Sequence, residues 1–305
     1  MIIRGHGGVR LAFFGRLPTL TDMVAGSQAR PEHSALRAFL VGGLALFLAL
    51  AAPAEAAEKK AKKKASAPPA ATTDLSWTGV GSAQYDACIK AALDDPKSGF
   101  DRATEWRDTG GGAPAKHCVA VALYALGEYG EAATRLEALA NEGKTLPRAL
   151  RIALLGQSGE AWMAENQYDR AKAVFGAALK LSPNDVGLLM QRSLAEAWSE
   201  DYFEAIDDLN KIIDLEPDHA DALAFRATAY RYVGSNELAA DDVERALKAQ
   251  PNHLGAMLER GILNRLDGDK KEARADWMAV IRLAPESPAA EAARNNLEKL
   301  DVKVE

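Results

Sequence analysis

The sequence repeats itself with a period of 34 residues. When the chain is aligned with itself at this offset, one column holds four alanines and another holds four prolines. The columns are Ala171, Ala205, Ala239 and Ala273, and Pro183, Pro217, Pro251 and Pro285. A fixed period of roughly 20 to 50 residues indicates a chain built from stacked copies of one supersecondary unit. This repeat constrains the fold more than any single motif does.

Each unit should consist of two helices joined by a turn. Large apolar residues recur along the unit, and small residues recur among them at Gly159, Ser193, Ala227 and Gly261. Small residues let the two helices approach closely, and the large ones fill the remaining space. The proline should end the second helix, because its ring is incompatible with a helix interior. Abundant alanine and few β-branched runs likewise favour helix, so we expect an all-α protein.

These columns together resemble the tetratricopeptide repeat family. The resemblance implies a right-handed α-solenoid of about five to six helical hairpins within residues 77–305. A fifth unit lacks the closing proline, and a sixth is degenerate. A capping helix with a polar outer face should close the solenoid. The expected units are 82–110 (degenerate), 113–143, 152–185, 186–219, 220–253 and 254–287, with the capping helix at 288–300.

The residues before the solenoid have a different composition. Residues 38–52 form an apolar run after Arg30 and Arg37, followed by Ala54-Glu55-Ala56, which has the form of a signal-peptidase site. We assign residues 1–56 to an N-terminal extension and signal peptide, and predict export to the periplasm. An uncleaved inner-membrane anchor is the alternative, although a spanning helix needs about 20 apolar residues. Residues 57–76 should form a disordered linker rich in Lys, Ala and Pro, or a weak contact with a membrane surface.

The charge distribution argues against nucleic acid as a partner. Residues 1–76 hold 10 Lys and Arg and 5 Asp and Glu, which leaves 27 basic and 38 acidic residues in 77–305, a formal charge of −11. A surface this acidic repels phosphate backbones. The expected partner is therefore a protein or peptide.

Charged residues also recur at the 34-residue period. Three arginines in the first helices each have an aspartate 16 residues later, in the second helix. The pairs are Arg192 with Asp208, Arg226 with Asp242, and Arg260 with Asp276. A partly buried guanidinium requires an acidic partner, so we predict a structural ladder of ion pairs. The alternative is a row of arginines that binds ligand carboxylates. Unit 152–185 has Ser158 and Val174 in these columns, so the ladder should stop there.

The family resemblance also implies where a partner binds. First helices of successive units line the concave face, where peptides or helices lie. Helical spacing predicts a mostly apolar groove with two arginines, and the Lys, Asn and Arg residues with which some members clamp a C-terminal carboxylate are missing. The expected groove residues are Met190, Leu194, Trp198, Phe225, Thr228, Arg231, Tyr232, Leu258, Ile262 and Arg265. The alternative to a groove that binds a partner is that the solenoid itself covers these side chains.

The remaining candidate groups have structural interpretations. Cys88 and Cys118 lie in the first helices of neighbouring units, and in an exported protein we expect a disulfide between them. His219 and His253 occupy equivalent positions after a column proline, and we expect both to face solvent. No spacing of His or Cys completes a metal site, and no nucleophile is matched with a base, so we expect neither metal, cofactor nor catalysis.

The sequence therefore predicts a non-catalytic scaffold or adaptor of the bacterial cell envelope. It would bind a peptide or helix in its apolar groove. The alternative is a self-assembling structural protein whose groove packs against another copy, or against its own C-terminal helix, as in a homo-oligomer.

Overall fold

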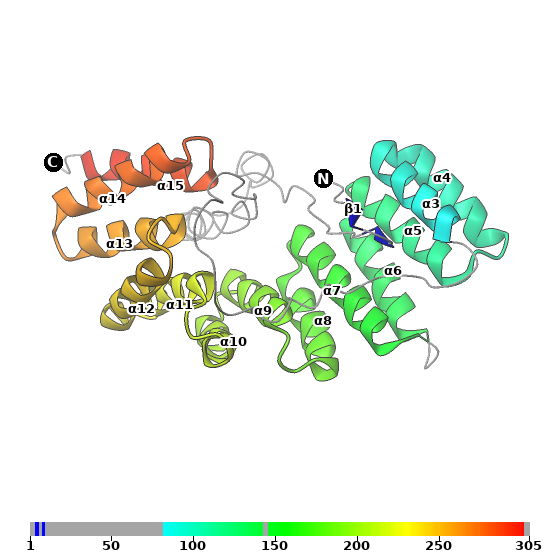
Figure 1. Ribbon diagram of the computed structural model, residues 1–305, viewed down its shortest axis with the longest axis horizontal. Coiled ribbons are helices and arrows are strands. Elements are labelled where there is room, and N and C mark those ends of the chain that lie inside the picture. Colours follow the sequence, from blue (N-terminus) through cyan, green and yellow to red (C-terminus); the bar gives the residue numbers. More distant parts are fainter. Residues whose placement is uncertain (1–3, 6–7, 10–81, 143–145, 302–305) are drawn as a thin grey trace, which may run out of the picture. The chain divides into compact units, whose positions relative to one another are not determined.

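The computed structural model describes residues 4–5, 8–9, 82–142 and 146–301 (Figure 1). They fall into two compact units, of which unit 1 ends at Ala195 and unit 2 continues from Glu196. Near the start of the chain, β1 (Arg4–Gly5) and β2 (Gly8–Val9) pair antiparallel. The expected linker, and the signal segment apart from these two short strands, lie outside the described residues. Within the described part, no helix combines the length and apolarity that a membrane crossing requires.

In unit 1, consecutive helices from α3 to α8 pack against one another (Figure 1, cyan to green). The α9 helix runs across the boundary, so its last three residues belong to unit 2. The helices are α3 (Ser82–Asp94), α4 (Pro96–Asp108), α5 (Gly112–Ala125), α6 (Tyr129–Asn141), α7 (Arg148–Ala164), α8 (Tyr168–Leu181) and α9 (Val186–Trp198).

Unit 2 continues the same alternation of first and second helices. Each second helix that precedes a column proline ends two residues before it, at Leu215, Ala249 and Leu283 in this unit and at Leu181 in unit 1. The helices are α10 (Tyr202–Leu215), α11 (Ala220–Tyr232), α12 (Asn236–Ala249), α13 (Leu254–Leu266), α14 (Lys270–Leu283) and α15 (Pro288–Asp301). Leu297 and Leu300 of α15 pack on the apolar cluster of α13 and α14, so this helix covers the last repeat.

The turn inside each hairpin from α5–α6 to α13–α14 has one residue with left-handed backbone. The positions are equivalent in the repeat, and the φ angles are 85° at Gly127, 60° at Asn166, 66° at Glu200, 79° at Gly234 and 93° at Gly268. Glycine adopts this conformation without a Cβ clash, and asparagine tolerates it. Glu200 is the one non-glycine residue among them without that tolerance.

The small-residue column sets the closeness of the two helices in a hairpin. A Cβ added at Gly159 would lie 2.4 Å from Phe175 Cε1, and one at Gly261 would lie 2.4 Å from Trp277 Nε1. Phe175 and Trp277 are fully buried, and Trp277 Nε1 donates a hydrogen bond to the Leu258 carbonyl at 3.2 Å. The large aromatic ring of the second helix therefore occupies the space that glycine leaves on the first.

The residue two positions after each column proline caps the next helix. In every case its side chain accepts a hydrogen bond from the backbone N–H three residues later, as an N-cap does. The capping residues are Asp185, His219, His253 and Ser287. The expectation of two solvent-facing histidines was wrong: His253 is buried and its Nε2 lies 2.9 Å from Asp221 Oδ1, while His219 is half-buried. Imidazole Nδ1 takes the place of the usual oxygen acceptor.

Candidate functional site

Arg226 ties three helices of unit 2 together. Its Nε and Nη2 each donate to a carboxylate oxygen of Asp242 on α12, both at 2.7 Å. Its Nη1 donates to Asn210 Oδ1 on α10 at 2.6 Å. The Asp242 side chain is only 3% exposed, so the two-pronged geometry compensates the desolvation of both charges.

The next unit repeats this arrangement. Arg260 donates from Nε and Nη2 to the two oxygens of Asp276, at 2.9 and 2.6 Å. Asn264 adds a hydrogen bond to the same carboxylate at 3.2 Å. Arg192 lies in unit 1 and Asp208 in unit 2, so this third pair stays a prediction. In the two hairpins of unit 2, the arginines are held by their own chain and do not form a row of free ligand donors.

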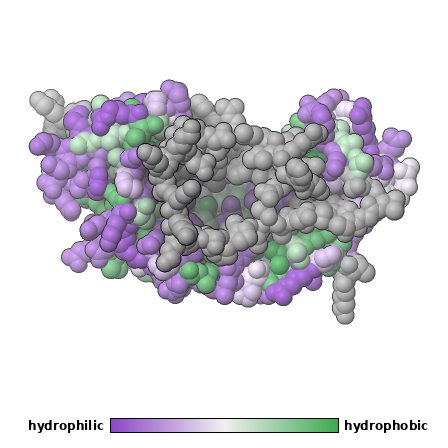
Figure 2. All heavy atoms as spheres, in the orientation of Figure 1, coloured by the Kyte–Doolittle hydropathy of each residue, from purple (hydrophilic) through white to green (hydrophobic). Residues whose placement is uncertain are grey.

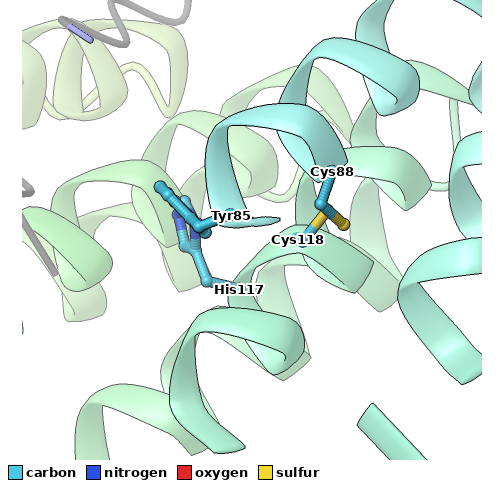
Figure 3. Close-up of a disulfide and its surroundings, with 4 residues drawn as sticks. All are labelled: Tyr85, Cys88, His117 and Cys118. Atoms are coloured by element: carbon cyan, nitrogen blue, oxygen red, sulfur yellow. A yellow bond between two sulfur atoms is a disulfide. The ribbon is translucent and has the colours of Figure 1, made fainter. Parts of the chain in front are cut away.

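Cys88 and Cys118 form a disulfide between α3 and α5, with their Cα atoms 6.2 Å apart (Figure 3). Both cysteines are buried in an apolar cluster that also contains Ile89 and Val119. The link joins the degenerate first repeat to the next unit.

Near the disulfide, His117 of α5 faces Tyr85 of α3 (Figure 3), and it also contacts Gln157 of α7. Tyr85 Oη lies 2.7 Å from Nδ1, and Gln157 Oε1 lies 2.7 Å from Nε2. The amide oxygen accepts only, so Nε2 carries the proton and Nδ1 accepts from the tyrosine hydroxyl. Burial lowers the pKa of His117 to about 4, which makes the ring neutral at ordinary pH. The contact is structural, and it joins α3 and α7 to α5.

The structure places the predicted groove residues on the first helices with unequal exposure. Four of them are buried: Leu194, Phe225, Thr228 and Leu258. The prediction that these four side chains form part of an open binding surface is therefore wrong. The partly buried residues are Met190 in unit 1 and Trp198, Arg231, Tyr232, Ile262 and Arg265 in unit 2. Figure 2 shows mainly hydrophilic side chains on the visible outer surface of the helices. On the face in view, the hydrophobic side chains that are not covered in grey gather in smaller patches.

Arg231 differs from its predicted role as a groove arginine. Its guanidinium forms an ion pair with Glu259 of α13 and lies 4.4 Å from the centre of the Tyr232 ring. Thr228 Oγ1 lies 3.2 Å from Glu259 Oε2, and the Tyr232 ring stacks on Tyr202 at 4.8 Å. The periodic pattern does not reveal Glu259, because its column holds Gln157, Gln191 and Phe225 in the other units.

Glu160 on α7 is the other acidic residue on this face that sequence reasoning missed as a site. It shares a column with Leu194, Thr228 and Ile262. Burial raises its pKa to about 7. Burial and the nearby Glu160 charge also raise the pKa of Tyr124 on α5 to about 12.

The geometry defines a protein made of stacked helical hairpins, in which side chains from successive first helices meet. The polar groups of this face mostly bind one another. Among the described residues no group of three or more His, Cys, Asp or Glu side chains is arranged to hold a metal ion.

Comparison with known proteins identifies the hairpin. Residues 153–185 and 225–288 match tetratricopeptide repeat family models, so these segments are tetratricopeptide repeats. Proteins of this family are generally non-catalytic scaffolds for protein–protein interaction. The predicted family and all-α solenoid fold are confirmed.

Solved structures are similar to this chain at low sequence identity. The C-terminal part of a TPR repeat-containing protein from Cytophaga hutchinsonii is 16% identical, with a TM-score of 0.55, over 72% of this chain and 84% of that chain. MamA from Desulfovibrio magneticus RS-1 is 22% identical, with a TM-score of 0.49, over 57% of this chain and 95% of that chain. The search of curated proteins gives no significant match.

Proposed function

We propose that this chain is a non-catalytic adaptor of the bacterial cell envelope that binds a peptide or helix on its first helices. The observation that supports the proposal is the presence of partly buried apolar and aromatic side chains on the first helices of unit 2, Trp198 and Ile262. Such residues supply most of the binding energy at protein interfaces. Arg226, Arg231 and Arg260 of unit 2 are held by Asp242, Glu259 and Asp276.

Photo-crosslinking in cells tests the binding face. A photoreactive amino acid replaces Trp198, and the same residue at exposed Asp207 on the outer helix α10 is the matched control. We expect one abundant heterologous protein from position 198 and not from 207. Equal capture from both positions would contradict binding on this face.

Self-association is the second candidate. Phe203 and Leu238, in the first turns of α10 and α12, are 70% and 48% exposed. Large exposed apolar side chains in the same unit can pack against another copy. Light scattering during size-exclusion chromatography separates the candidates, because a dilution-insensitive oligomer favours self-assembly and a monomer favours a different partner.

The envelope location is proposed from the apolar run and the Ala-x-Ala sequence that follows it. Mass spectrometry of protein purified from cells measures its N-terminus. Export with cleavage after Ala56 gives a mature chain that starts at Ala57. An intact N-terminus in an inner-membrane fraction would favour the anchored alternative.

A further inference from the structure

The Glu160 carboxylate lies where the proposed function places a partner. It is on a first helix, α7, in the column of Leu194, Thr228 and Ile262. The residue is partly buried. Among the described residues, no hydrogen bond or ion pair reaches its carboxylate. The carboxylate is therefore partly shielded from water and has no partner from its own fold.

Tyr124 of α5 lies near enough to this carboxylate for the Glu160 charge to raise the pKa of its hydroxyl. The hydrogen bond between His117 and Gln157 shows that α5 and α7 are neighbours, and Glu160 lies one turn after Gln157 on the same helix face. Tyr124 lies two turns after His117, and a tyrosine in a helix points back toward the N-terminus. This direction brings its ring toward the level of Glu160. The Tyr129 ring of α6 packs edge-on against Tyr124, with centroids 5.0 Å apart.

Glu259, on the first helix α13, is an acidic residue whose carboxylate has partners within the protein. Its carboxylate is also buried, but Arg231 and Thr228 bind it from the preceding first helix. On α7, the position that corresponds to Thr228 is Glu160 itself, and Met163 stands where Arg231 stands on α11. Helix α7 thus has an acidic residue, Glu160, but no arginine at the position of Arg231.

We propose that Glu160, with Tyr124 beside it, binds a positively charged side chain of the protein partner, arginine or lysine. The inference rests on the proposed function and names the chemistry that its first helices recognise. A guanidinium can bind such a site, because it forms an ion pair with a carboxylate and stacks on a neighbouring aromatic ring. The formal charge of −11 in residues 77–305 favours the approach of such a partner.

A titration with small probes tests the site without the partner. The purified protein, labelled with 13C at glutamate carboxyls, is titrated with N-acetyl-arginine methylamide, and the Glu160 signal is assigned by its loss in E160Q. N-acetyl-citrulline methylamide, which has the same shape without the charge, is the control probe. We expect a saturable shift with arginine and at least a tenfold weaker response with citrulline. The Glu160 pKa should also fall from about 7 toward that of an ordinary glutamate.

Two variants separate the site from general charge effects. E160Q should fold, because burial at this position favours the uncharged form, and it should lose the arginine-dependent shifts of the Tyr124 signals. E128Q removes an exposed carboxylate of the same unit and should bind arginine as the wild type does. Equal responses to both probes, unchanged binding by E160Q, or no saturation up to about 100 mM would overturn the inference. Failure of the Trp198 crosslink with a positive titration would overturn only the proposed partner-binding face in unit 2.

Discussion

At the scale of single residues, a partly buried arginine in a helical repeat is explained by its acidic partner. Arg226 and Asp242 are side chains of one hairpin that are 16 residues apart, and both are largely withdrawn from water. A pair of this kind adds little net stability, but removing one member leaves an uncompensated charge.

Asp242→Ala should therefore lower the free energy of unfolding by about 3 kcal/mol. The exposed neighbour substitution Asp241→Ala is the control and should change it by less than about 0.5 kcal/mol. Urea denaturation followed by circular dichroism gives both values. Replacing the pair together, as R226M/D242L, should recover much of the loss, and a double variant as unstable as D242A would contradict the pairing argument.

His117 should make the protein less stable in mild acid. Its pKa is about 4 when folded and about 6.5 in an unfolded chain, so the unfolded state binds the proton first as the pH falls. The stabilisation present above pH 6.5 is lost progressively toward pH 4, by about 3 kcal/mol in all.

The measurement is the free energy of unfolding between pH 7.5 and 4 for wild type and His117→Gln. The raised pKa of Glu160 acts in the opposite direction over part of this range, and comparison of the two proteins cancels it. Parallel pH profiles would show that His117 does not contribute.

At the scale of helices and turns, residues with left-handed backbone conformation occur at equivalent positions of the repeat. Glycine or asparagine occupies the left-handed position of four hairpin turns, and Glu200 occupies it in the fifth. A glutamate in this conformation is strained by about 1 kcal/mol.

Glu200→Gly should accordingly stabilise the protein by about 0.5 kcal/mol, since relief of strain exceeds the added entropy of the unfolded chain. Asn166→Gly, at the equivalent turn, is the matched control and should be nearly neutral. Differential scanning calorimetry measures both. Destabilisation by E200G alone would show that the glutamate side chain has a stabilising contact.

At the scale of the whole molecule, stability in a solenoid is a sum of repeats and of the contacts between neighbours. The disulfide lies in the most degenerate part of the repeat array and closes a loop of 30 residues. The chain-entropy argument assigns such a loop about 3 to 4 kcal/mol.

C88A/C118A should therefore increase amide hydrogen exchange in α3 to α5 and leave α11 to α14 almost unchanged. Exchange measured by mass spectrometry on oxidised wild type and the variant resolves the two regions. A uniform increase along the chain would mean that the repeats unfold as one cooperative body.

The sequence by itself determined what recurs: the helical hairpins, the column of small residues packed by large apolar ones, and the spacing of arginine and aspartate. These features follow from short-range geometry that every unit repeats, so a 34-residue comparison reveals them. Only the tertiary structure decided contacts that occur once, such as Arg231 with Glu259 and His117 with Gln157, or the lack of a partner for Glu160. They depend on which side chains of neighbouring first helices are long enough to meet, and a periodic pattern carries no information on that.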